Sequence, residues 1–280
     1  MIQGYRMAGP PPHGEPPAAP PPSERGWPPW LGFVTLGVVV FVSNVVFSIV
    51  AGASGADFDD TPAWLDLAGA VILQSSLLAA ALIAASLFMP LHPWQFGLRP
   101  VRFPRAVGWA ALGMVAFYLS AALWVALIGE PEQSTAEDIG AEESDLALYA
   151  AGVMFIFMAP VAEEVFFRGF FYGALRSRLP VIWAALVCGV VFGAIHFGSG
   201  VSAVPILMVL GVIFCLVREK TGSLYPCIGM HALNNTLAYA GQTDVPVGVA
   251  LALGAVMLAA VSLFPLLAWR RPPQPTPTAA

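Results

Sequence analysis

Long apolar runs, separated by short polar segments, dominate the chain between residues 31 and 269. A helix that spans a bilayer needs about 20 apolar residues, and eight runs are close to this length. They are 31–53, 63–89, 106–129, 146–175, 181–197, 201–217, 222–240 and 246–269. The alternating pattern of a membrane β-barrel is absent, and helices satisfy their own backbone hydrogen bonds in lipid. The pattern therefore predicts an all-α polytopic membrane protein with about eight transmembrane helices.

Both ends of the chain differ in composition from this membrane region. Residues 1–30 contain ten prolines and no continuous apolar core, which is typical of a disordered arm and not of a signal peptide. Residues 270–280 are a similar, shorter tail. We expect a transmembrane domain over 31–269. The proline-rich arm is a candidate for binding an unknown partner, although a plain unstructured tail is the simpler interpretation.

Composition supports the membrane assignment. Hydrophobic residues make up 58% of the 280 positions and charged residues only 10%, whereas soluble domains carry roughly 25% charged residues. A soluble enzyme and a disordered protein are both excluded, and three cysteines in apolar runs exclude a disulfide scaffold. The lipid bilayer is the expected surrounding of the chain, and no nucleic-acid partner is expected.

The charges also predict an orientation. Eight spans place every loop arginine and lysine on one side of the membrane and the acidic loops on the other. By the positive-inside rule, the N- and C-termini are then cytoplasmic. Eleven arginines against one lysine favour a bacterial source, and hence the bacterial plasma membrane.

Four charged residues lie within the predicted spans. Asp66 follows Thr61-Pro62 in the first turn of a predicted helix, where an acidic side chain is favoured. The other three, Glu163, Glu164 and Arg168, lie together in one apolar segment. A charge at the bilayer centre costs at least about 2.5–3.5 kcal/mol, so such residues usually pair or have a function. Glu164 and Arg168 are four residues apart and can neutralise each other on one helix face. Glu163 lies about 100° further round the helix and is free to act elsewhere, so it is the candidate proton acceptor.

Two histidines and an asparagine reach a similar depth on other spans. His196 ends one apolar run, whereas His231 and Asn235 share a face of another. Either histidine alone is most simply a polar contact between helices. Together with the carboxylates and Arg168, these side chains predict a buried polar site.

This set of residues lacks a convincing nucleophile but can activate water. Glu163 could act as a general base while histidine and asparagine donors hold the oxyanion of a tetrahedral intermediate. Alternatively, Glu163, His196 and His231 could coordinate Zn²⁺ with one position open for water. Either chemistry predicts the hydrolysis of an amide or ester.

Three motifs in this order resemble those of the CPBP family, the CAAX proteases and bacteriocin-processing enzymes also called Abi. The motifs are Glu163-Glu164-x-x-x-Arg168, Phe192-x-x-x-His196 and His231-x-x-x-Asn235. The segment Phe96-Gly97-Leu98-Arg99 is similar to one found upstream in that family, so the resemblance covers about residues 95–240.

The resemblance implies an eight-helix intramembrane endopeptidase, similar to type II CAAX prenyl endopeptidases, that acts on a protein or peptide. Glu163 would activate water with help from His196, and His231 and Asn235 would form the oxyanion hole. Glu164 and Arg168 would support the site. The family's mechanism is described both as metal-dependent and as glutamate-based, and we favour the glutamate mechanism.

Two other functions fit a buried polar site. A non-enzymatic membrane protein of the peptide-binding or immunity type could use the same side chains to hold a partner. A proton-coupled transporter could use buried glutamate and histidine as a proton relay, although the sequence shows no convincing internal repeat. Substitution of Glu163, His196 and His231 distinguishes these alternatives from a protease.

Overall fold

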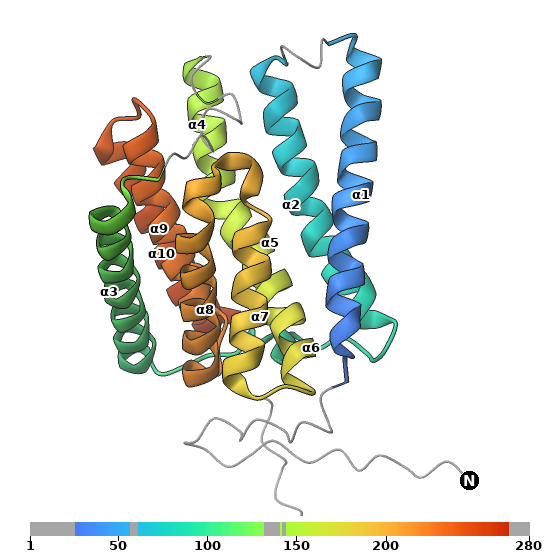
Figure 1. Cartoon of the computed structure of the whole chain (residues 1–280), viewed down its shortest axis with the longest axis vertical. Helices are drawn as coiled ribbons and strands as arrows, with labels where there is room; N and C mark the ends of the chain where they lie inside the picture. Colours follow the sequence, from blue (N-terminus) through green and yellow to red (C-terminus); the bar gives the residue numbers. More distant parts are fainter. Residues whose placement is uncertain (1–25, 57–60, 132–140, 142–143, 269–280) are drawn as a thin grey trace, which may run out of the picture.

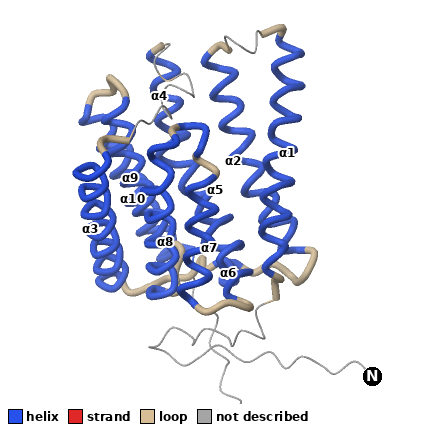
Figure 2. Tube along the Cα trace, viewed as in Figure 1, coloured by secondary structure: helices blue, strands red, loops and turns tan. Residues whose placement is uncertain are grey.

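The computed structural model describes residues 26–56, 61–131, 141 and 144–268, so the predicted arm and tail fall almost entirely outside the described residues. Every regular element within them is helical (Figures 1 and 2). The α-helices are α1 Pro29–Ser54, α2 Ala63–Ser86, α3 Phe103–Ile128, α4 Asp145–Val153, α5 Ala159–Glu164, α6 Tyr172–Arg176, α7 Val181–Ala194, α8 Val204–Thr221, α9 Tyr225–Gln242 and α10 Val247–Ala268.

Because α4, α5 and α6 form one continuous rod over Asp145–Arg176, the described chain has eight helical rods, as the apolar pattern predicts. Six segments are long and apolar enough to cross a membrane. They are Pro29–Ser54, Ala63–Ser86, Phe103–Ile128, Asp145–Arg176, Val201–Thr221 and Val247–Phe264. The other two rods are α7, with 14 residues, and the more polar α9, with 18.

Proline and serine explain where several helices begin. Pro104, Pro205 and Pro226 lie in the first turns of α3, α8 and α9, where a missing backbone N–H costs nothing. Ser144 caps α4 by accepting a hydrogen bond from the backbone N–H of Ala147. These signals lie at the ends of the apolar runs, so most helix ends fall within a few residues of the expected positions.

The rod Asp145–Arg176 departs twice from regular α-helical geometry. Residues Met154–Met158 and Val165–Phe171 are π-helical and flank the six-residue helix α5. Pro160 stands at the start of α5, where its ring removes one backbone donor. π-Helical turns are rare and occur frequently at functional sites. Here they bracket the segment that carries Glu163 and Glu164.

Every residue of the π-helical segment Val165–Phe171 is buried. Its aromatic rings pack edge to face, as in the pairs Phe166–Phe170 and Phe167–Phe192. α1 and α2 pack beside it on one flank, and α7 and α8 on the other. The central rod therefore holds its polar side chains inside a ring of helices.

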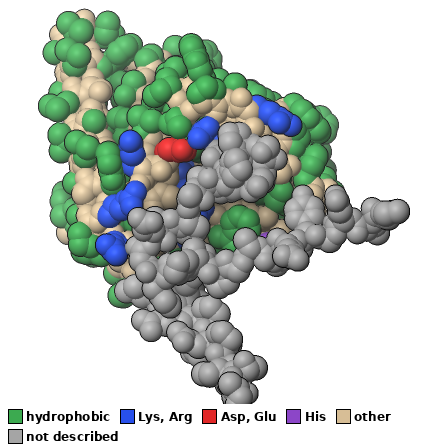
Figure 3. Space-filling view, turned by 90° about the horizontal axis from the view of Figure 1, so that it is seen from below, with side chains coloured by type: hydrophobic (Ala, Val, Ile, Leu, Met, Phe, Trp, Pro, Cys, Tyr) green, Lys and Arg blue, Asp and Glu red, His purple; other side chains and the backbone are tan. Residues whose placement is uncertain are grey.

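The outer surface of the bundle is apolar, with large exposed side chains such as Phe41, Ile83 and Leu119. An apolar exterior is expected of a protein that faces lipid. Lysine and arginine side chains gather on one end face of the described molecule (Figure 3). The fold is that of an integral membrane protein with its loop cations at one end.

Candidate active site

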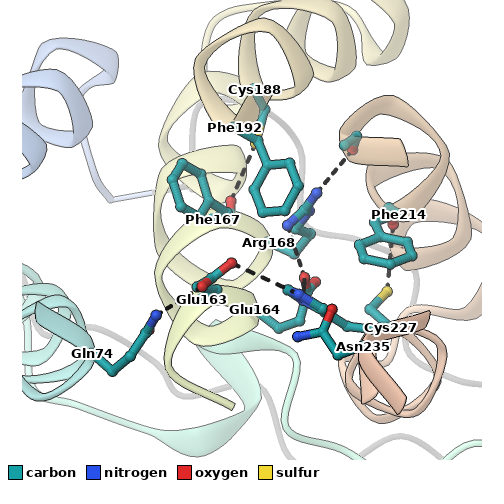
Figure 4. Close-up of polar contacts among 12 residues, drawn as sticks. Gln74, Glu163, Glu164, Phe167, Arg168, Cys188, Phe192, Phe214, Cys227 and Asn235 are labelled. Carbon is teal, nitrogen blue, oxygen red and sulfur yellow. Dashed lines mark hydrogen bonds and ion pairs between the residues drawn. The ribbon is translucent and has the colours of Figure 1, made fainter. Parts of the chain in front are cut away.

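Glu163 and Glu164 are buried inside the bundle, with 7% and 0% of their surface exposed. Because they are adjacent in a helix, their side chains point in different directions (Figure 4). Glu164 faces Arg168, and Glu163 faces α2. The helix thus presents two carboxylates to two different sets of partners, as their spacing predicts.

Arg168 pairs with Glu164 inside the core. Its Nη1 lies 2.8 Å from Oε1 of Glu164, and neither side chain is exposed. Nη2 donates a second hydrogen bond, of 3.2 Å, to the carbonyl oxygen of Gly211 on α8. The guanidinium carbon also lies 4.2 Å from the ring centre of Phe192 and 4.9 Å from that of Phe214. An ion pair, a carbonyl and two aromatic faces together compensate a charge that would be costly to bury alone.

His231 of α9 connects the two carboxylates. Its Nδ1 lies 2.9 Å from Oε1 of Glu164, and its Nε2 lies 3.8 Å from Oε2 of Glu163. The first distance is a hydrogen bond and the second is too long for one. Because an ionised carboxylate only accepts hydrogen bonds, Oε1 of Glu164 accepts one from Nδ1–H of His231, and this bond fixes the orientation of the ring. Nε2 is thereby directed towards Glu163.

Gln74 of α2 completes the surroundings of Glu163. Its Nε2 donates a buried hydrogen bond of 2.8 Å to Oε1 of Glu163, whereas Oε2 of Glu163 is buried without a hydrogen-bond partner. Gln74 was not predicted as a site residue, because its side chain is uncharged and lies in an apolar run. A polar residue three and seven positions before Leu77 and Ala81, on the same helix face, is the signal that could have identified it.

Asn235 lies one helical turn beyond His231 on α9. Its Nδ2 donates a hydrogen bond of 2.9 Å to the carbonyl oxygen of Phe155, in the first π-helical segment. A carboxamide nitrogen carries two protons, so one donor remains after this bond. The structure places Asn235 beside the carboxylate cluster (Figure 4).

His196 has no hydrogen bond or ion pair to the described residues of this cluster. Helix α7 ends at Ala194, and His196 follows it, with Nδ1 2.7 Å from the carbonyl oxygen of Phe192. The ring of Phe192 lies 4.9 Å from the ring of His196 and 6.0 Å from that of His231. The part of His196 in the site therefore stays a prediction.

The same geometry tests the zinc-binding alternative. Over the described residues, no three histidine, cysteine, aspartate or glutamate side chains converge as a metal-ligand set. Glu163, His196 and His231 do not fit the three-ligand arrangement in these positions, since Phe192 lies against both imidazoles.

An apolar cavity of about 500 Å³ lies on the other flank of α5. Val161 and Val165, which bracket the two glutamates in sequence, form part of its wall. Leu91, Phe96 and Leu98 of the loop between α2 and α3 form another part, and α9 and α10 close it. The cavity is separate from the polar cluster but shares the helix that carries it.

A model of a protein family, described as "Type II CAAX prenyl endopeptidase Rce1-like", matches residues 145–237. That segment holds all of the cluster except Gln74. Two proteins of Bacillus subtilis (strain 168) are similar to parts of the chain. "Uncharacterized protein YyaK" is 28% identical over 134 residues, which cover 45% of this chain and 44% of that protein. "Putative membrane peptidase YdiL" is 25% identical over 87 residues, or 31% of this chain and 35% of that protein.

These similarities are partial. The chain aligns with less than half of the length of either curated relative. No solved structure matches the chain.

Proposed function

We propose that this chain is an intramembrane endopeptidase, because residues 145–237 match the model of the Rce1-like type II CAAX prenyl endopeptidase family. Its substrate is a membrane-associated protein or peptide, and the reaction is hydrolysis of a peptide bond by activated water. The chain resides in a bacterial plasma membrane with its arginine-rich end face and both termini in the cytoplasm, in keeping with the positive-inside rule.

The main support for this proposal is the carboxylate oxygen Oε2 of Glu163, which has no hydrogen-bond partner. Oε2 is buried, lacks a hydrogen-bond partner and faces Nε2 of His231 across 3.8 Å. A water molecule beside these two atoms can donate one hydrogen bond to the carboxylate. A general base must lie within hydrogen-bond reach of its water, and this unpartnered oxygen supports that role for Glu163.

In the proposed reaction, the oxygen of the water molecule attacks the carbonyl carbon of the substrate while Glu163 accepts a proton from that water. The resulting tetrahedral intermediate carries an oxyanion. Glu163 returns the proton to the amide nitrogen, the C–N bond breaks, and a carboxylic acid and an amine are released. Glu163 ends as it began, so the proton balance closes.

Two side chains of α9 are placed to stabilise the oxyanion. The second amide proton of Asn235 is available, and Nε2 of His231, when protonated, is a further donor on the side of Glu163. A donor of this kind is typically worth about 10²–10³ in kcat. Glu164 holds His231 in place and Arg168 balances the charge of Glu164.

The decisive test is cleavage of a reporter peptide by the full chain in liposomes. Glu163→Gln keeps the size of the side chain and its contact with Gln74 but removes the base. We expect a loss of about 10²–10⁴ in kcat, the usual contribution of a general base. Glu130→Gln, at an exposed position, is the matched control and should cleave normally.

His231→Ala and His196→Ala are measured in the same assay. Loss of cleavage in His231→Ala is expected, and the result for His196→Ala decides whether that histidine takes part. Full cleavage by Glu163→Gln would reject the protease assignment. A binding protein would keep its phenotype in all three variants, and a transporter would show pH-dependent flux in the same liposomes.

A further inference from the structure

Two arginines at the cation-rich end of the bundle have no acidic partner among the described residues. Arg99 lies in the loop between α2 and α3, and Arg218 lies in the last turn of α8. The Nε atom of each is buried without a hydrogen-bond partner. Burying part of a charged group without a partner is costly, so this pair needs an explanation.

The fold forces these two side chains together. The guanidinium of Arg218 lies directly against Gly97, where an added Cβ would be 2.1 Å from Nη2. Gly97 has φ of +79°, so glycine is required there both by conformation and by space. The loop is held on the turn between α8 and α9, because the N–H of Leu224 donates to the carbonyl oxygen of Gly97 and the hydroxyl of Ser223 donates to that of Arg99.

Glu219, the acidic side chain that acts electrostatically on Arg218, is already engaged by other partners. Its two carboxylate oxygens accept hydrogen bonds from Arg176, each of 3.2 Å, and one of them accepts a further bond of 3.0 Å from Tyr172. Burial lowers the pKa of Arg99, as expected when an apolar environment disfavours the charged form. Arg99 and Arg218 also repel each other. An anion between them would satisfy both.

We infer that Arg99 and Arg218 form a binding site for the phosphate group of an anionic membrane lipid. Guanidinium groups bind phosphate through paired hydrogen bonds with fitting geometry. The site lies at the end of a membrane-spanning helix, on the face where the other loop cations gather (Figure 3), and basic pockets at this level bind lipid head groups.

A neighbouring feature favours a lipid over a soluble phosphate. The loop that carries Arg99 also forms one wall of the 500 Å³ apolar cavity, through Phe96 and Leu98. One segment of chain therefore presents a cationic end and an apolar wall within a few residues. An amphiphile with a phosphate head matches both chemistries.

The test uses the full chain in a neutral detergent with three additions: phosphatidylglycerol, phosphatidylcholine or inorganic phosphate. We expect phosphatidylglycerol to raise the Tm and to remain bound in native mass spectrometry, and the other two to do neither. Arg99→Gln and Arg218→Gln should each weaken retention of phosphatidylglycerol roughly tenfold, the effect of losing one charged hydrogen bond. Arg178→Gln, at an exposed position on the same end of the bundle, removes the same charge and should not.

The lipid-free protein gives a second measurement. With no anion present, Arg218→Gln removes an unpartnered charge, so the Tm of this variant should be unchanged or higher. If Arg218 had a purely structural role, its replacement would lower the Tm. Arg99→Lys and Arg218→Lys keep the charge, so they report on binding if a glutamine variant fails to fold. Equal retention in the site variants and in Arg178→Gln would overturn the site, and an equal response to inorganic phosphate would overturn its assignment to a lipid.

Discussion

The two oxygens of Glu163 have different surroundings, and this difference decides what the residue can do. Oε1 is fixed by Gln74, and Oε2 is left for a water molecule. A carboxylate that rotated freely would place its basic oxygen towards His231 only part of the time. We therefore assign Gln74 the role of a positioning residue, which orients the base without touching the substrate.

Gln74→Leu tests this role. The substitution keeps the volume but removes the donor, and a hydrogen bond to a charged group is worth about 1.5–3 kcal/mol. In the proteoliposome assay we expect kcat to fall about tenfold or more while KM stays unchanged, because the substrate site is intact. Leu73→Ala, its neighbour on the exposed side of α2, serves as the control.

A fall in stability without a change in kcat would mean that Gln74 has only a packing role. Equal effects on kcat and KM would place it in substrate binding instead. Either result contradicts the assignment of Gln74 as a positioning residue.

Individual residues of the site were predictable from the sequence to different degrees. The pair Glu164–Arg168 follows from helical spacing alone, since four residues make one turn. For His231, the sequence predicted only a depth in the bilayer similar to that of the glutamates, and not its contacts with them. Gln74 was missed because it is uncharged and nothing in the sequence connects it with Glu163, 89 positions away. His196 was expected in the site from its depth, and its part there stays a prediction, since its Nδ1 lies beside the carbonyl oxygen of Phe192 just beyond the end of α7.

At the scale of elements, helix positions were predictable and their distortions were not. Apolar length and proline placement locate the rods to within a few residues. The two π-helical segments depend on how the central rod packs against its neighbours, because a π-turn is not favoured by its own sequence. They flank α5, and the carbonyl of Phe155 that receives Asn235 lies in the first of them.

Close packing of α7 on α8 depends on small residues. An added Cβ on Gly189 would lie 2.8 Å from the backbone nitrogen of Val212 and 2.8 Å from the carbonyl oxygen of Met208. Backbone atoms cannot move aside as a flexible side chain can, so the two helices must separate. This pair of helices supplies Phe192, Gly211 and Phe214 to the surroundings of Arg168.

Gly189→Ala should therefore lower the free energy of unfolding by about 1–3 kcal/mol, the usual cost of overpacking a core. Gly37→Ala is the matched helical control, because nothing lies within 4 Å of its added Cβ, and it should be neutral or slightly stabilising. Thermal or denaturant unfolding in detergent measures both. Equal stability of the two variants would show that α7 and α8 adjust their separation without cost.

At the scale of the whole molecule, the loop charges and the fold agree. Figure 3 shows lysine and arginine gathered on one end face of the described molecule, as the segregation of charge along the chain predicts. Eight rods bring both ends of the described chain to the same end of the bundle (Figure 1). The proposal that this end is cytoplasmic rests on the positive-inside rule.

Single-cysteine labelling tests this orientation. The native Cys188, Cys215 and Cys227 are fully buried, so they should not react with a membrane-impermeant maleimide. Arg178→Cys, at the cation-rich end, should be labelled only when the cytoplasmic side is accessible, in inverted vesicles. Asp244→Cys, in the exposed turn between α9 and α10, should be labelled in intact spheroplasts. The reverse pattern would invert the proposed topology.

The candidate site is assembled from residues that are far apart along the chain. Gln74 belongs to the second rod, the glutamates to the fourth and His231 to the seventh. During synthesis, a chain with only its first six rods in the membrane holds the base but lacks His231 and Asn235. The proposed protease therefore stays inactive until its seventh rod packs into the bundle, so an incompletely folded chain does not cleave neighbouring membrane proteins.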